Sequence, residues 1–329
     1  MMPVVDVVIP AFHPEERLLR ILEMMEVQTV RPRCVRIINT EREGLTALLN
    51  ARGMTEEGLR KRFAFLSLEH ISAEEFDHGG TRNRGFRACC GADYVLTMTQ
   101  DALPLDEELI ARLLCGLQCS GRSEEASQGR IAVAYARQMP NEGAPVEEQL
   151  SRGFNYPPVS RVKSEADLPE LGIKTYFCSN VCALYRMDIW HALGGFPERA
   201  IFNEDMIYAA KALKAGYRIA YAADAAVCHS HSYTASQQFH RSFDLGVSQA
   251  QNPQVFSGIR SESEGISYVK AVMAEMIREH AAGKIPGFIW RSGWRLIGYR
   301  MGKAYDRLPR SLAVRCSSNR NYWKNGTAA

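Results

Sequence analysis

Three sets of acidic and histidine side chains are the residues most able to do chemistry. Asp101 stands just past an apolar run, where a lone carboxylate can hold a divalent cation such as Mn²⁺ or Mg²⁺. His229 and His231 are two residues apart, so on a strand both rings would point to one face and could bind a metal or an oxyanion. Glu204 and Asp205 open an expected helix, where the helix dipole favours acids, but an aspartate there can also deprotonate a hydroxyl.

The glycine pair Gly79-Gly80 and the residues that follow have the composition of a phosphate cradle. The glycines let the backbone approach a ligand closely, and Thr81 can cap the helix expected over 81–92. The amides of the first helical turn favour an anion, and Arg82 adds a planar fork of donors. A plain glycine turn before a capped helix accounts for the same pattern equally well.

An aromatic side chain follows the first apolar run, in Pro10-Ala11-Phe12. At the end of a strand such a ring could stack on a base, although a core phenylalanine explains it equally well. There is no Gly-x-Gly-x-x-Gly after this run and no Gly-x₄-Gly-Lys-Ser/Thr anywhere. A dinucleotide-binding Rossmann domain and a P-loop NTPase therefore lose their main support.

The elements that must position these residues alternate between strands and helices. Apolar runs predict strands over 4–9, 34–38, 63–68, 94–98 and 131–135, and helical periodicity predicts helices over 15–28, 81–92 and 106–117. This alternation indicates a mostly parallel sheet covered by helices on both faces. In such sheets the ligand lies outside the carboxyl ends of the strands, so the loops after these runs should form the site.

The second half of the chain is less regular. Residues 138–170 contain five prolines and many charges, which predicts a long functional or poorly ordered loop. Strand character returns over 173–185, 218–221 and 226–228, with helices over 188–193 and 203–215. After residue 236 the pattern is helical almost to the end.

Composition indicates an ordinary globular protein. The chain has 329 residues, 46% of them hydrophobic and 23% charged. No run of about 18 apolar residues predicts a transmembrane helix, and the N-terminus resembles a buried strand more than a signal peptide. The nine cysteines include no Cys-x-x-Cys pair, which favours reduced thiols in the cytoplasm.

The net charge of +3 is unevenly distributed. From Lys270 to the end, twelve Lys and Arg face three acids. Within this tail, residues 285–305 interleave Trp and Tyr with Arg and Lys, the composition of a helix lying in a membrane interface. A helix that packs on the rest of the chain and shows a solvated basic side fits as well. Nucleic acid is not expected, since no recognised binding module accompanies the charge.

The order of these motifs resembles the family-2 glycosyltransferases of GT-A fold. Within that family, the segments His78-Gly79-Gly80-Thr81-Arg82-Asn83, Thr99-Gln100-Asp101-Ala102 and His229-Ser230-His231-Ser232-Tyr233 resemble the bacterial rhamnosyltransferase branch. The resemblance covers about residues 4–233. It implies an α/β fold with a GT-A-type, mostly parallel sheet flanked by helices. It also implies a nucleotide-sugar-binding and catalytic domain over 1–234 and a basic helical C-terminal extension over 235–329.

The resemblance also implies roles for individual residues. Asp205 would be the catalytic base, with Glu204 beside it, and Asp101 would be the last acid of the family's DxD motif, whose first acid is replaced by Thr99. The metal, Mn²⁺ or Mg²⁺, would be held by Asp101 with His229 and His231. The nucleotide sugar would be contacted by Pro10, Ala11, Phe12, Thr40, Glu41, Gly80, Arg82, Asn83, Gln100 and Asp101.

The implied reaction is an inverting sugar transfer in cell-surface polysaccharide synthesis, with dTDP-β-L-rhamnose as the first-choice donor and a lipid-linked saccharide as acceptor. UDP-galactose, UDP-N-acetylglucosamine, or a non-catalytic member that binds a nucleotide sugar are the alternatives. We expect a cytoplasmic protein that is peripheral on the inner face of the membrane. Residues 285–324 would bind the anionic membrane surface. A homo-oligomer is left open.

Overall fold

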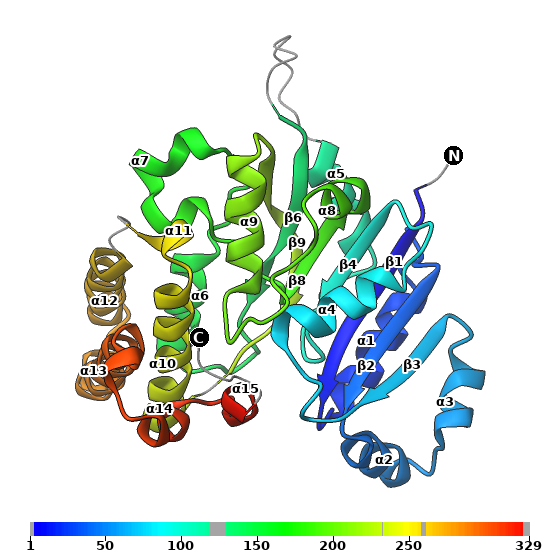
Figure 1. The fold of residues 1–329 in the computed structure, drawn as a ribbon, viewed down its shortest axis with the longest axis horizontal. Coiled ribbons are helices and arrows are strands. Elements are labelled where there is room, and N and C mark those ends of the chain that lie inside the picture. Colours follow the sequence, from blue (N-terminus) through cyan, green and yellow to red (C-terminus); the bar gives the residue numbers. More distant parts are fainter. Residues whose placement is uncertain (1–2, 119–128, 232, 258–260, 325–329) are drawn as a thin grey trace.

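The structure is a computed structural model that describes residues 3–118, 129–231, 233–257 and 261–324 (Figure 1). Its nine strands form one sheet in the order β3-β2-β1-β4-β8-β6-β9-β5, with β7 also paired to β9. The strands are β1 (Val5–Phe12), β2 (Cys34–Thr40), β3 (Leu66–Ile71), β4 (Tyr94–Met98), β5 (Leu103–Pro104), β6 (Ile131–Met139), β7 (Arg161–Lys163), β8 (Cys182–Arg186) and β9 (Arg218–Cys228).

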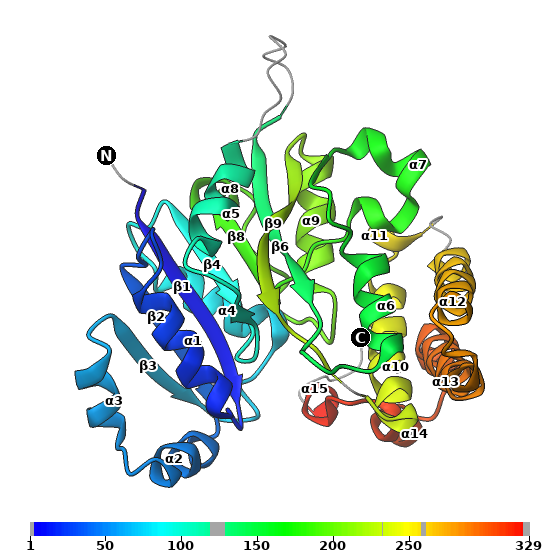
Figure 2. The same cartoon turned by 180° about the vertical axis from the view of Figure 1, so that it is seen from behind.

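Helices cover the sheet and form a cluster at one side of it (Figures 1 and 2). The helices are α1 (Glu16–Glu26), α2 (Arg42–Ala51), α3 (Glu56–Arg62), α4 (His78–Arg87), α5 (Leu109–Gln118), α6 (Val146–Asn155), α7 (Leu168–Leu171), α8 (Met187–Ala192), α9 (Glu204–Lys214), α10 (Ala235–Gln251), α11 (Pro253–Phe256), α12 (Ser261–Arg278), α13 (Ile285–Lys303), α14 (Arg310–Cys316) and α15 (Arg320–Lys324). Among the described residues, no helix is long and apolar enough to cross a bilayer.

The sheet is mixed, with a parallel half and a half that alternates in direction. Strands β3, β2, β1 and β4 run parallel, whereas β8 is antiparallel to both β4 and β6, and β9 is parallel to β6. The reversal follows from where β8 begins. The amide of Thr99, just past the end of β4, donates to Val181, just before the start of β8. The two strands therefore leave this edge in opposite directions.

Two apolar layers hold the sheet between helices. On β1, Val7 and Ile9 face the core shared with α1 and α5, while Val8 faces the core shared with α4, α8 and α9. This alternation is the period of a strand buried on both faces, and each fully buried side chain of this size contributes about 1.5–3 kcal/mol. Because both faces are filled, the open edge at the carboxyl ends of β1, β2 and β4 is where a ligand can bind.

Two local expectations are corrected. Helix α4 begins at His78 rather than at Thr81, and its cap is Asp77, whose Oδ1 accepts from the amides of Gly79 (2.9 Å) and Gly80 (2.8 Å). Residues 218–228 form the single strand β9 rather than two short strands, with an irregular register near Ala222.

The segment 138–170 is not a loop without structure, as its prolines suggested. It contains α6, α7 and β7, and β7 adds to the sheet beside β9. None of the side chains of α6 is fully buried. The helix packs its partly buried Leu150 and Phe154 against α12, and it is also supported by pairs such as Arg152 Nε to Glu148 Oε1 (2.9 Å), four residues apart.

Helix α13 packs directly on α10, backbone against backbone. A Cβ built on Gly302 would stand 2.0 Å from the carbonyl oxygen of Phe243, and one on Gly298 would stand 2.3 Å from that of Phe239. On α10 itself, a Cβ on Gly246 would stand 2.3 Å from the carbonyl oxygen of Tyr299. Only glycine permits this approach, so the contact fixes which face of α13 turns outward. The expected boundary between a catalytic domain over 1–234 and an extension over 235–329 stays a prediction.

Candidate functional site

Asp101, His229 and His231 come together at the carboxyl ends of β4 and β9. One ligand atom from each lies within 4.8 Å of the others. The Nε2 of His231 is 3.0 Å from Asp101 Oδ2, the Nε2 of His229 is 3.6 Å from Asp101 Oδ1, and the two Nε2 atoms are 2.9 Å apart. The histidines follow β9 rather than lying on it. The convergence of three ligand atoms nevertheless matches the expected metal site.

A shell of hydrogen bonds orients His229. Its Nδ1 is 3.0 Å from Gln138 Oε1, and the Nε2 of Gln138 donates to Tyr156 Oη (2.6 Å) and Ser179 Oγ (2.9 Å). With the Gln138 oxygen fixed, Nδ1 of His229 is the donor and the lone pair of Nε2 faces Asp101 and His231. Burial lowers the pKa of His229 to about 3, so the ring is neutral, as a metal ligand must be.

This donor set fits a divalent cation. Burial is the largest single influence and opposes ionisation of Asp101, but the hydrogen bonds from His231 and Thr99 and the charges of the two histidines together outweigh it. They keep the pKa of Asp101 below its ordinary value. The cluster therefore presents one ionised carboxylate and two imidazole nitrogens. Carboxylate oxygen suits Mg²⁺ and Mn²⁺, and imidazole nitrogen suits first-row transition metals, so the set fits a divalent cation.

Asp205 lies in the first turn of α9. The helix is preceded by Asn203, in the left-handed region at φ 62°, and Asn203 Nδ2 is held by Ser248 Oγ of α10 at 3.3 Å. Asp205 accepts hydrogen bonds from the amides of Asn180 (3.0 Å) and Met206 (2.8 Å). Burial, reinforced by the neighbouring charge of Glu204, raises the pKa of Asp205 to about 7. A carboxylate of this basicity is suited to accept a proton from a hydroxyl near neutral pH.

Glu204, next in the chain to Asp205, is committed to other contacts. Its Oε1 lies 3.1 Å from Arg82 Nη1 and accepts from Asn180 Nδ2 at 3.0 Å. Burial alone would raise the pKa of Glu204, but the charges of Arg82 and His78 and the hydrogen bond from Asn180 together outweigh burial and lower it. Glu204 therefore stays ionised and holds Arg82 and Asn180 in place, and its expected part in proton transfer stays a prediction.

Continuous contacts connect the two carboxylate centres. The residues Ser179 and Asn180 are adjacent in the chain. Asn180 binds Asp205 through its amide, and Ser179 binds Gln138, which in turn orients His229 beside Asp101. The structure thus brings Asp101 and Asp205, 104 positions apart in the sequence, to one edge of the sheet.

The residues expected at the nucleotide base lie together at the ends of β1 and β2. Phe12 pairs in register with Thr40, and half of its surface is exposed (50%). Gln100 holds this end of β1, because its side-chain amide accepts from Phe12 N and donates to Phe12 O, both at 2.8 Å. Thr40 is buried, and Glu41 is half-exposed beside His13. An exposed ring with a fixed backbone is able to stack on a base.

The glycines and Asn83 contact the chain itself. A Cβ on Gly79 would stand 1.9 Å from Pro197 O, and one on Gly80 would stand 3.2 Å from Glu198 O, so the close approach is to this loop rather than to a ligand. Asn83 is fully buried, and its amide exchanges two 2.9 Å hydrogen bonds with the backbone of Phe196. The expected contacts of Gly80 and Asn83 with the nucleotide stay predictions that this geometry does not favour.

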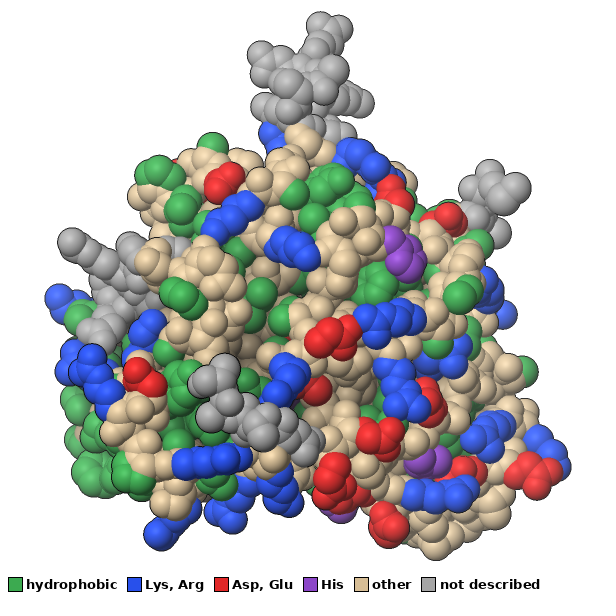
Figure 3. All heavy atoms as spheres, in the orientation of Figure 1, with side chains coloured by type: hydrophobic (Ala, Val, Ile, Leu, Met, Phe, Trp, Pro, Cys, Tyr) green, Lys and Arg blue, Asp and Glu red, His purple; other side chains and the backbone are tan. Residues whose placement is uncertain are grey.

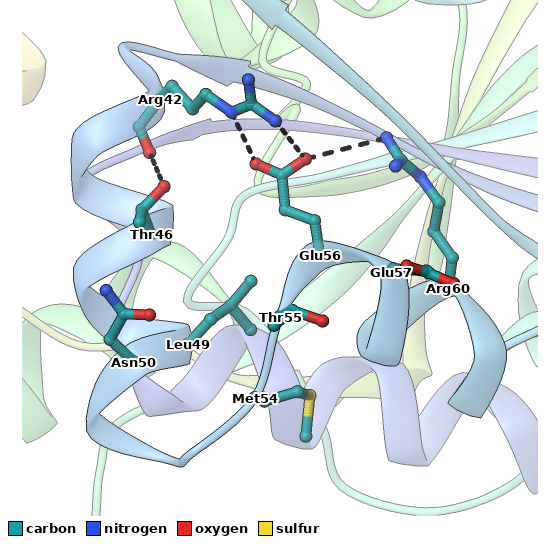
Figure 4. Close-up of a pocket in the computed structure, with 9 residues that line it drawn as sticks. All are labelled: Arg42, Thr46, Leu49, Asn50, Met54, Thr55, Glu56, Glu57 and Arg60. Atoms are coloured by element: carbon teal, nitrogen blue, oxygen red, sulfur yellow. Dashed lines mark hydrogen bonds and ion pairs between the residues drawn. The ribbon is translucent and has the colours of Figure 1, made fainter.

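A separate pocket of about 510 Å³ lies between α2 and α3 (Figure 4). In Figure 4, Glu56 points across it and is paired with both Arg42 and Arg60. None of the expected site residues lines it. The acid in the pocket is already neutralised by two guanidinium groups, so the pocket offers no reactive group to the site described above.

Several residues of the site were missed by sequence reasoning. Gln138 and Asn180 connect the two halves, and Arg152 donates to Gln138 from α6. Arg241, on α10, places its guanidinium over the ring of Tyr233 at 4.7 Å. Tyr233 lies two residues after His231, in a motif that the sequence did single out. The other four carry no local signal, because their contacts cross 8 to 91 positions of the chain.

Comparisons with known proteins identify the family of the chain. The chain is 33% identical over 324 residues to the O-antigen chain rhamnosyltransferase RfbN of Salmonella typhimurium (strain LT2), covering 98% of this chain and 96% of that protein. It is 38% identical over 258 residues to the O-antigen chain rhamnosyltransferase WbaN of Salmonella anatum, covering 78% of each. No family model matches the chain.

Among solved structures, the fold is similar to that of the mannosyltransferase PcManGT from Pyrobaculum calidifontis, determined in complex with GDP-Man and Mn²⁺. The TM-score is 0.51 at 15% identity, and the match covers 99% of this chain and 89% of that one. A match at this identity shows the fold, a GT-A-type α/β sheet with C-terminal helices.

Proposed function

Since this chain belongs to the family of O-antigen chain rhamnosyltransferases, which are glycosyltransferases, we propose that it moves L-rhamnose from dTDP-β-L-rhamnose to a lipid-linked saccharide, with inversion at the anomeric carbon. The observation that carries the proposal is Asp205. It is a carboxylate with a pKa raised to about 7, connected through Asn180, Ser179 and Gln138 to the Asp101 cluster.

The proposed reaction is a single displacement. Asp205 accepts the proton of the acceptor hydroxyl, whose oxygen forms a bond to the anomeric carbon while the bond from that carbon to the diphosphate oxygen breaks. The leaving diphosphate takes the electron pair. A divalent cation held by Asp101, His229 and His231 would stabilise the negative charge that collects there. Attack from the face opposite the leaving group gives the α-rhamnoside.

The donor is tested with the purified full chain and a panel of dTDP-β-L-rhamnose, UDP-galactose and UDP-N-acetylglucosamine. We expect release of the nucleoside diphosphate to be fastest with the rhamnose donor and to require added Mn²⁺ or Mg²⁺. The rate without acceptor should be slow and should rise when a lipid-linked saccharide is added. Faster turnover of either UDP-sugar would contradict the rhamnose assignment.

An anionic membrane surface is the proposed location of the acceptor, bound through residues 285–324. Helix α13 turns an apolar stripe outward, because its glycine face is used against α10. The exposed apolar side chains on α13 are Ile289 (49%), Trp290 (64%), Leu296 (44%) and Ile297 (48%). Figure 3 shows hydrophobic side chains gathered over α12 and α13 at the lower left, with Lys and Arg side chains along the lower edge. Aromatic and aliphatic groups beside basic groups suit a headgroup boundary.

Vesicle flotation tests this surface. Replacing exposed bases Lys303 and Arg307 together by Gln should weaken binding to anionic vesicles about 30-fold, at about 1 kcal/mol for each base. The matched control replaces Arg60 and Lys61, exposed on α3 at the other side of the molecule in Figure 1, and should bind as the wild type does. Equal binding of the wild type to anionic and neutral vesicles would remove the membrane surface from the proposal.

A further inference from the structure

Arg241 lies between the two halves of the site. It stands in the second turn of α10, and its guanidinium carbon is 4.7 Å from the ring centre of Tyr233 and 5.4 Å from that of Phe202. The Tyr233 ring stacks on His231, with ring centres 5.1 Å apart and planes 30° apart. Phe202 immediately precedes the turn that starts α9. Arg241 is therefore held beside the Asp101 cluster on one side and beside the Asp205 helix on the other.

The charge of Arg241 is not compensated, unlike that of the other arginines brought to the site by α4 and α6. Arg82 is paired with Glu204 at 3.1 Å, and Arg152 is paired with Glu148 at 2.9 Å. Within the part of the chain that the structure describes, no carboxylate lies within 4.0 Å of Arg241, and its side chain is exposed. Two aromatic faces orient this guanidinium and leave its N–H groups available to a ligand.

We propose that Arg241 binds the diphosphate of the donor nucleotide. A planar fork of donors matches phosphate oxygens, and Arg241 contacts the Tyr233 ring that stacks on His231, which places it near the Asp101 cluster, where negative charge would collect on the leaving group. Arg17, from α1, is less suited, because its Nη atoms already donate to Asn141 Oδ1 (2.9 Å) and to the carbonyl oxygen of Asp101 (3.4 Å). This inference rests on the proposed function, and it adds a nucleotide contact from a helix outside the segment that carries the other motifs.

Titration of the full chain with dTDP, in buffer that contains Mn²⁺, tests the contact directly. Arg241→Gln should raise the Kd for dTDP about 10-fold, at the low end for a hydrogen-bonded charge because the group is exposed. The Kd for thymidine, which lacks the phosphates, should not change. Arg241→Lys keeps the charge but loses the planar fork, so its Kd should fall between the two. The difference between wild type and Arg241→Gln should shrink as salt is raised.

The matched control is Arg186→Gln. Arg186 also places its guanidinium over a tyrosine, Tyr94, at 5.7 Å, but this pair lies at the opposite end of β4. Unchanged dTDP binding in Arg241→Gln, or equal weakening in Arg186→Gln, overturns the inference. A different result would contradict the proposed function without contradicting the Arg241 contact. If dTDP binding depends on Arg241 but no rhamnose is transferred, the diphosphate contact stands and the rhamnosyltransferase assignment falls.

Discussion

Asp205→Asn is expected to lower kcat by about 10²- to 10⁴-fold, the usual effect of removing a positioned base. The substitution keeps the size of the side chain and one oxygen that can accept from the Asn180 amide, so this contact should persist. The second acceptor, which the Met206 amide uses, is replaced by an NH2 group. Donor binding should change little, because Asp205 faces the incoming hydroxyl in the proposed reaction. Steady-state kinetics with saturating donor and acceptor measure kcat, and dTDP titration measures binding.

The pH profile gives this prediction a second readout. The pKa of Asp205 is raised to about 7, and a base must be deprotonated to act. The kcat of the wild type should therefore fall about tenfold for each pH unit below that value and level off above it. Asp205→Asn should lack this limb. The control Asp224→Asn, an exposed aspartate on β9, should keep both kcat and the profile. A wild-type rate in Asp205→Asn would show that another group takes the proton.

Asp101→Asn is expected to remove the metal site, because Asp101 is its single carboxylate. Loss of a group that stabilises developing charge should lower kcat/KM by about 10²- to 10³-fold. The wild type, stripped of metal with a chelator, should lose activity to the same extent and recover it with Mn²⁺ more fully than with Mg²⁺, given the two imidazole ligands. Mn²⁺ titration followed by electron paramagnetic resonance reports the site without an assay of turnover.

Asp106→Asn is the control for this change. Asp106 lies five residues further along and is paired with Arg112 on the surface at 2.8 Å. It should bind Mn²⁺ and turn over donor as the wild type does. Full activity of the metal-stripped wild type would contradict the metal site, whatever the effect of Asp101→Asn.

Most strands of the first half could be predicted because they are apolar runs buried on both faces. The half-buried strand β3 lies three residues later than the expected 63–68, and α2 and α3 were not predicted. An apolar run such as 94–98 is long enough to be a strand and too short to be a helix, and β4 has these bounds. Direction could not be predicted in the same way. A buried run is equally apolar whether its neighbours are parallel or antiparallel, so the reversal at β8 leaves no mark on residues 182–186.

Polar helices were harder to predict. Helix α6 carries no fully buried side chain and stands among prolines, so its composition suggested a loop. Its apolar residues Val146, Leu150 and Phe154 nevertheless recur at helical spacing. The cap of α4 was placed at Thr81 because the two glycines suggested a loop. They are helical instead, because the loop at Pro197 and Glu198 needs the space that a Cβ would fill. The loop that requires glycine at these two positions of α4 is distant from them in sequence.

The residues of the site also fall into two groups, those that the sequence alone reveals and those that it does not. Asp101, Asp205, His229 and His231 are reactive residue types at the ends of recognisable elements, and they are the ones that the sequence marks. Their supporting partners, such as Gln138, are ordinary polar residues defined by long-range contacts. A side chain of this kind acquires its part only when the sheet brings distant segments together.

The glycine contact between α10 and α13 has a consequence for how far a substrate must reach. No layer of side chains separates the two backbones, so no side chains lie between them that could rearrange to accommodate a tilt of α13 relative to α10. Thr234, whose hydroxyl caps α10 by accepting from Gln237 N at 3.3 Å, lies three residues after His231. In the proposed function, a bilayer that orients α13 would therefore set the depth of the reaction centre above its headgroups. A saccharide anchored in that bilayer would then meet Asp205 only when its sugar chain spans this height, which would make acceptor length itself a criterion of selection.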